Sequence, residues 1–302
     1  MSSPTSLRKL ASLTLLLLLG LAACSAPGTL NLLPAPATST STPTPPPTPT
    51  VTPIPLALSV NGEGISVIEF DAELARYQQA QSVLGATPTP DAAKKAVQDD
   101  LVDTLLLAQA AAAKGITLTD ATVQTHIDNL AAQVGGSNGL SAWETSHGYT
   151  DADFRIALRR QLFAAAMRDQ ITAAVPSTAE QVHVKQILLY NSDAAQLALG
   201  YLKTGWNFND LAARYDPLTK GELGWFPKGY LPDPLIETAV FALQPGQYTD
   251  IVQTSAGYDI LYLVERDPAR PLSPDALLTL QEHAVQDWLT QARNKGTIQI
   301  TP

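Results

Sequence analysis

The pattern that most restricts the fold of this chain lies between residues 181 and 264. A β-rich run, QVHVKQILL, opens this segment at 181–189, and the Gly-flanked aromatic pair Trp225-Phe226 predicts a turn further along. A short apolar helix follows, then a turn at Pro245-Gly246, and then two further β-rich runs at 248–254 and 258–264. This order of strand, turn, helix and two strands narrows the fold more than any other part of the sequence.

Length and charge exclude several classes of function. The chain has 302 residues, which is enough for about two domains. It is acidic, with 28 Asp and Glu against 19 Lys and Arg, and therefore lacks the basic surface that nucleic-acid binding requires. We expect no nucleic-acid partner and no cofactor, since phosphate-binding glycine loops and nucleophile–base motifs are both missing from the sequence.

The N-terminus has the features of a signal peptide over residues 1–23. Arg8-Lys9 precede an apolar run at 10–22 that is too short for a membrane-spanning helix, which needs about 20 residues. The run ends in Leu-Ala-Ala-Cys, which resembles the bacterial lipobox, and this resemblance implies lipidation of Cys24. The alternative is an incidental cysteine in an ordinary secretory leader. Cys24 is the single cysteine of the chain, so no internal disulfide forms.

Residues 24–55 are predicted to be a linker between this leader and a folded body. They hold ten of the 23 prolines of the chain, and no charged residue occurs between Leu10 and Gly62. A segment of this composition cannot bury a core and favours extended, polyproline-like conformers.

The body that follows is predicted to be mainly helical. A strand at 56–60 and a turn at 61–62 lead into it. Capping residues predict where the helices begin: Ser66, the segment after Pro88–Pro90, Thr119, Ser141 and Thr150, with stops near Gln81, Gly115, Gly135-Gly136 and Pro176.

Two segments of the sequence resemble known protein families. The segment 181–266 resembles the parvulin family of peptidyl-prolyl isomerases, in its turn and in its last two strands. The pattern V-N-G-x-x-I-x-x-x-x-F, present from Val60 to Phe70, is similar to the N-terminal region of SurA- and PrsA-type foldases. Together they imply an α+β chain with a SurA-N-like helical module at 56–176 and a parvulin-like domain at 177–268, the latter a small antiparallel sheet wrapped by helices.

The parvulin resemblance implies which residues form a site. Its apolar pocket positions correspond to Leu231, Leu235 and Phe241, and its polar centre to Gln186, Asp216, Thr254 and Asp259. Gln186 and Asp259 stand where the family has two histidines. A glutamine amide can donate a hydrogen bond to a carboxylate, so we expect these two side chains to preserve the contact between central strands.

The C-terminal residues 269–302 are predicted to return to the helical module. A helix at about 275–295 is followed by a β-like run at 297–301. Because an isolated strand leaves its backbone groups unpaired, we expect 297–301 to pair with 56–60.

The histidines and the acidic run at 99–103 are not predicted to form a functional site. The four histidines, His126, His147, His183 and His283, lack metal-ligand spacing, and His183 points away from the Gln186 face because its offset in the strand is odd. Asp99, Asp100 and Asp103 are interpreted as a solvated helix face.

These resemblances imply a lipid-anchored, extracytoplasmic foldase on the bacterial cell membrane, which acts as a chaperone and as a parvulin-type peptidyl-prolyl cis-trans isomerase. Its partners would be unfolded or nascent secreted polypeptides with Xaa-Pro bonds. The alternatives are a holdase that has lost catalysis and a ligand-binding lipoprotein of a transporter, and the latter is disfavoured because two alternating α/β lobes are not predicted.

Overall fold

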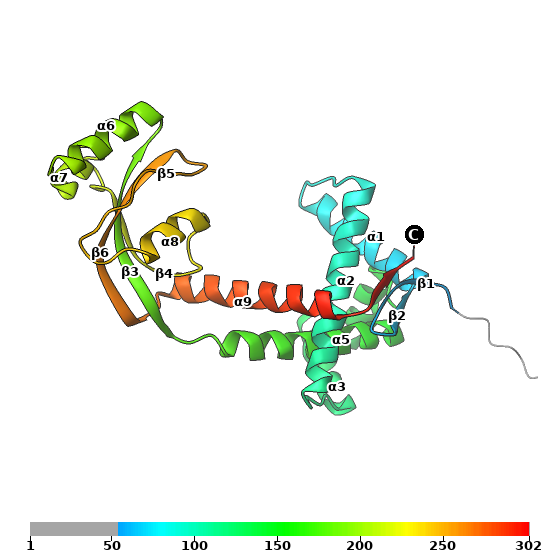
Figure 1. Ribbon diagram of the computed structural model, residues 1–302. Coiled ribbons are helices and arrows are strands. Elements are labelled where there is room, and N and C mark those ends of the chain that lie inside the picture. Colours follow the sequence, from blue (N-terminus) through cyan, green and yellow to red (C-terminus); the bar gives the residue numbers. More distant parts are fainter. Residues whose placement is uncertain (1–53, 302) are drawn as a thin grey trace, which may run out of the picture. The chain divides into compact units, whose positions relative to one another are not determined.

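The computed structural model describes residues 54–301. The predicted signal peptide, Cys24 and nearly all of the 24–55 linker lie outside these residues. Within 54–301, none of the helices combines the length and apolar character needed to cross a bilayer. The described residues form two sheets, each with its own helices, and Figure 1 shows the order of these elements.

The first sheet joins the two ends of the described chain. Its strands are β1 (Leu56–Val60), β2 (Glu63–Ser66) and β7 (Ile298–Ile300), in the order β2-β1-β7. Asn61 and Gly62 connect β1 to β2 with positive φ angles of 53° and 89°, as a tight hairpin turn requires. β7 pairs antiparallel with β1, with Val60 opposite Ile298, so the predicted return of the C-terminal strand is confirmed.

Six helices accompany this sheet, and with it they are called the helical module here. They are α1 (Val67–Val83), α2 (Pro90–Ala113), α3 (Asp120–Gln133), α4 (Ser137–Ser146), α5 (Asp151–Ala173) and α9 (Pro274–Lys295). The predicted caps Ser66, Thr119 and Thr150 each accept a backbone N–H of the first turn. Helix propensity alone is weak, and the apolar faces of these helices bury a shared core.

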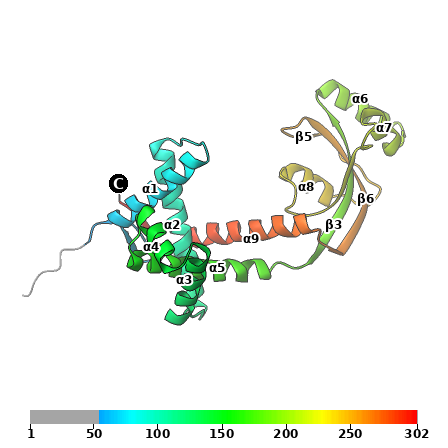
Figure 2. The same ribbon diagram turned by 180° about the vertical axis from the view of Figure 1, so that it is seen from behind.

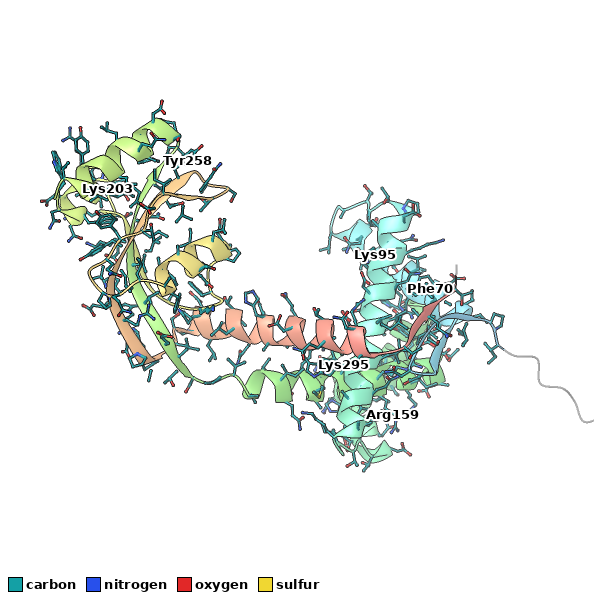
Figure 3. The ribbon with its side chains drawn as sticks, viewed as in Figure 1. Phe70, Lys95, Arg159, Lys203, Tyr258 and Lys295 are labelled. Carbon is teal, nitrogen blue, oxygen red and sulfur yellow. The ribbon has the colours of Figure 1, made fainter. Side chains whose placement is uncertain are left out.

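The core of the helical module is continuous from the first sheet to α9. Phe70 of α1, labelled in Figure 3, packs with Leu58 and Val60 of β1 and with Leu105 of α2. Trp288 of α9 packs against this cluster and also against the neighbouring one that holds Met167 of α5. The C-terminal helix is therefore part of this core.

One predicted helix start is wrong. Ser141 lies inside α4, which begins four residues earlier at Ser137. Gly135 and Gly136 both have positive φ, and this lets the chain reverse at once from α3 into α4. Ser141 therefore has no free first turn to cap.

The acidic run on α2 is not simply a solvated face. The Arg293 guanidinium of α9 donates to Asp103 Oδ1 at 2.6 Å, to Asp99 Oδ1 at 3.2 Å and to the Asp99 carbonyl at 3.0 Å. A hydrogen bond from Lys95 and then one from Arg293 hold the pKa of Asp99 below its ordinary value, against the effect of partial burial. These contacts fasten α9 to α2.

The second sheet is antiparallel and has helices on both faces. Its strands are β3 (Thr178–Leu189), β4 (Glu222–Pro227), β5 (Val252–Gln253) and β6 (Tyr258–Pro271), in the order β4-β3-β6-β5. Its helices are α6 (Ser192–Lys203), α7 (Phe208–Tyr215) and α8 (Pro234–Phe241). We call these strands and helices the sheet domain (Figures 1 and 2).

Alternation along the two central strands divides the core of the sheet domain. Ile187 and Ile260 face α6 and α7, where they pack with Leu199 and Leu211. Val184, Leu261 and Leu263 belong to the opposite cluster, which holds Phe226 of β4 and Val240 of α8.

Two expectations for the sheet domain need correction. Gly224, Trp225 and Phe226 form part of β4 rather than a turn, and Gly224 has a φ of 79° next to a shift in the pairing register with β3. Of the predicted strand 248–254, only β5 and a bridge between Tyr248 and Tyr262 are regular. The ladder is interrupted because the Thr249 hydroxyl accepts the Leu261 N–H at 3.0 Å.

Candidate functional site

Gln186 and Asp259 lie on the two central strands of the sheet domain. Gln186 of β3 is opposite Leu261 of β6, and Asp259 is opposite Leu188. Since residues two apart share a strand face, both side chains belong to the face covered by α8. They are diagonal neighbours, for which a Cα separation of about 7–8 Å is usual.

Asp259 takes a different partner from the expected one. Its Oδ2 accepts a hydrogen bond from the Thr254 hydroxyl at 2.9 Å, in the loop between β5 and β6. Among the described residues, no hydrogen bond joins the side chains of Gln186 and Asp259, although the sequence had suggested one. The structure thus pairs two of the four predicted polar residues. Figure 3 labels Tyr258, the neighbour of Asp259 at the start of β6.

The Asp259 carboxyl is buried, and only one of its two oxygens has a hydrogen-bond partner among the described residues. Only 1% of the residue is exposed, and its Oδ1 has no hydrogen-bond partner in the described part of the protein. Burial raises the pKa of this carboxyl, the Thr254 hydroxyl works in the opposite direction, and the nearby Asp233 carboxylate adds to the rise. A buried carboxylate with one oxygen unpartnered is costly, so this position favours the neutral acid more than water does.

Asp216 has a local structural role. It ends α7, and its Oδ1 accepts the backbone N–H groups of Leu218 and Thr219, each at 3.1 Å. The hydrogen bond from the Thr219 hydroxyl lowers the pKa of Asp216 most, and these backbone groups lower it further. The turn they form leads to Gly221, whose carbonyl accepts the Gln186 N–H at 2.7 Å. Asp216 therefore supports the backbone beside Gln186.

The three predicted pocket residues lie on α8 and on the loop before it. Leu231 and Phe241 are half-buried against the cluster that contains Val240, whereas Leu235 is 54% exposed. The Arg266 guanidinium donates to the carbonyls of Phe241 and Leu243, at 2.9 and 2.8 Å, and so holds the end of α8. Leu235 is thus the most accessible of the three apolar side chains.

Sequence reasoning missed Glu237 of α8. This residue is 6% exposed, and its carboxylate accepts three consecutive backbone N–H groups, those of Gly229, Tyr230 and Leu231. The sequence signal was a single charged residue in the mostly apolar run PLIETAVF. Its partners lie outside the helix, so spacing within the helix could not identify them.

His183 lies apart from this group, as its odd offset predicts. It is opposite Glu265, its ring stacks on Trp225 with centroids 5.3 Å apart, and its Nε2 contacts Glu222. Within residues 54–301, no three His, Cys, Asp or Glu side chains gather as a metal site would require.

Two protein families match successive parts of the chain. The family described as SurA-like N-terminal domain matches residues 48–168, and the family described as PPIC-type PPIASE domain matches residues 190–265. The two matches follow the helical module and the sheet domain in order.

Individual relatives share less than a third of their residues with this chain. "Chaperone SurA" of Methylobacillus flagellatus is 26% identical over 218 residues, which cover 59% of this chain and 49% of the relative. "Foldase protein PrsA" of Bacillus subtilis is 29% identical over 131 residues, which cover 40% and 45%. The crystal structure of peptidylprolyl isomerase PrsA from Bacillus cereus is 20% identical with a TM-score of 0.44, covering 80% of this chain and 86% of that one.

The chain spans about half the length of these curated relatives. Its helical module is nevertheless of the SurA N-terminal type, and its sheet domain is of the PPIC type. The chain therefore has a SurA-like N-terminal domain followed by a PPIC-type domain, and it is similar to chaperones of the SurA type and foldases of the PrsA type.

Proposed function

We propose that this protein is a foldase that combines a chaperone module with a parvulin-type peptidyl-prolyl cis-trans isomerase. The observation that carries the proposal is the succession of SurA-like and PPIC-type domains in one chain. We take residues 56–176 as the chaperone module, 177–268 as the isomerase-type domain and 269–302 as the segment that returns to the module.

The chemistry requires no covalent intermediate. Rotation about a prolyl amide crosses a barrier of about 18–20 kcal/mol, and a catalyst must favour the twisted amide in a dry, apolar setting. Leu235, which is exposed, and the half-buried Leu231 and Phe241 would contact the proline ring. The raised pKa of Asp259, which is bonded to Thr254, would lower the negative charge near that ring, with Gln186 as the amide donor on the same face.

The setting we propose is the outer side of the bacterial cell membrane. Residues 1–23 would be removed as a lipoprotein signal peptide, Cys24 would carry the lipid, and the linker 24–55 would hold the folded body away from the bilayer. The partners would be unfolded or nascent secreted polypeptides with Xaa-Pro bonds.

A second candidate is a holdase with reduced or absent catalysis. It is favoured by one observation: both histidine positions of the family carry other residues, and one of these, Asp259, is bonded to Thr254 rather than across the strands. In this case, the apolar residues around α8 would serve binding alone.

The test is an NMR exchange experiment on Xaa-Pro peptides, run beside an aggregation assay with an unfolded client. Faster cis–trans exchange supports the isomerase. Suppressed aggregation without faster exchange supports the holdase. If the protein does neither, both candidates are wrong.

A further inference from the structure

The loop that carries Leu231 is held by a single buried carboxylate. Glu237 Oε2 accepts the Gly229 N–H at 2.7 Å, and Oε1 accepts the N–H groups of Tyr230 and Leu231 at 2.8 and 2.7 Å. Successive backbone N–H groups that converge in this way form a concave anion-binding site, and here the anion is supplied by the protein itself.

The surroundings of Glu237 fit its hydrogen-bonding role. It belongs to the first turn of α8, where the helix dipole favours an anion, and it receives three hydrogen bonds of the charge-assisted kind. Gly229 needs a φ of 84° to turn its N–H toward Glu237, a conformation that side-chain-bearing residues rarely adopt. The loop is thus shaped around the carboxylate.

Glu237 also connects the residues of the proposed pocket. It lies two residues after Leu235 and four before Phe241 on α8, while its carboxylate holds the backbone N–H of Leu231. The position of Leu231 relative to the other two apolar side chains therefore depends on the Glu237 bonds.

We infer that Glu237 is a positioning residue for the binding of proline-containing peptides, and that it acts through Leu231. The inference rests on the proposed function. Glu237 touches no reacting atom, so it should affect how tightly a peptide is held and leave the rate of bond rotation in the bound peptide unchanged.

The test uses Glu237→Gln in the full chain. The amide keeps the size of the side chain but has one oxygen, so at least one backbone N–H must face an NH₂ group. The control is Glu265→Gln, which makes the same charge change at an exposed residue of β6. NMR titration with an Xaa-Pro peptide gives Kd, exchange within the bound peptide gives the turnover rate, and the amide shifts of residues 229–231 report on the loop.

We expect Glu237→Gln to raise Kd about tenfold, which corresponds to partial loss of one charge-assisted hydrogen bond. The NMR signals of the three backbone amides, 229–231, should also shift. Glu265→Gln should change neither. Leu231→Ala should also raise Kd, and adding Glu237→Gln to it should raise Kd little further, because the two residues act as one unit.

Four results would overturn the inference. A wild-type Kd in Glu237→Gln, or full additivity with Leu231→Ala, rejects the positioning role and leaves the proposed function standing. A wild-type protein that binds no Xaa-Pro peptide rejects the proposed function together with this role. If Glu237→Gln fails to fold, Glu237→Asp replaces it, and an unchanged Kd there rejects the inference.

Discussion

Removing the Arg293 guanidinium should loosen the helical module without affecting the sheet domain. The substitution Arg293→Met keeps much of the apolar stem and removes three hydrogen bonds to Asp99 and Asp103 of α2. It also leaves those two carboxylates, four residues apart on one helix face, without this shared cation.

The size of the effect follows from the partial exposure of the group. Hydrogen bonds to charged groups contribute roughly 1.5–3 kcal/mol when buried, whereas exposed ion pairs contribute about 0.2–1 kcal/mol. The side chains of Arg293, Asp99 and Asp103 are 32%, 42% and 29% exposed, so the group lies between these limits. We expect a loss of about 1–2 kcal/mol in the free energy of unfolding of the helical module, reduced by added salt.

Native-state hydrogen exchange measures this loss locally. Amides in α2 and α9 should exchange about tenfold faster in Arg293→Met, while those of β3 and β6 keep their protection. The matched control is Lys95→Met, since Lys95 pairs with the same Asp99 but is 75% exposed, and little change is expected there. Equal effects of the two substitutions would refute the reasoning that α9 is fastened by Arg293.

Three further predictions address other parts of the chain. Deletion after Arg293 removes β7 and should cost the helical module about 2–4 kcal/mol, and unchanged protection of residues 97–112 would contradict this. Burial raises the pKa of Asp259 in the folded state, so its contribution to stability becomes less favourable as pH rises from the ordinary value of 3.8 through the folded-state pKa. Asp259→Asn should therefore gain stability relative to wild type as pH rises through that range in urea titrations, and a difference that stays constant with pH would reject this. Cys24→Ala should release the protein from the membrane fraction, and normal maturation and fractionation would reject lipidation.

Local signals in the sequence predicted the elements well because they act within one turn. Ser66, Thr119 and Thr150 cap the helices they were expected to cap. The pairing of β7 with β1 was also predictable, since a lone strand needs a partner and the C-terminal run supplied one.

The errors arose where a partner distant in sequence decided the outcome. Arg293 lies 190 residues from Asp103, so the acidic run looked solvated when read alone. The turn predicted at Gly224 is wrong because three residues do not reveal the pairing of β4 with β3. In the candidate site, the face of Asp259 was predictable from strand alternation, but its bond to Thr254 and the three bonds of Glu237 depend on loop geometry.

The measurement that tests the account most directly is the cis–trans exchange rate of an Xaa-Pro peptide with wild-type protein and with Gln186→His/Asp259→His. We propose that the chain keeps the fold and the apolar residues of a parvulin, whereas its polar centre is altered. We therefore expect weak acceleration by the wild type and faster exchange with the double variant, while both proteins suppress client aggregation. Wild-type exchange as fast as that of a parvulin with both histidines, with no gain from the substitutions, would contradict it.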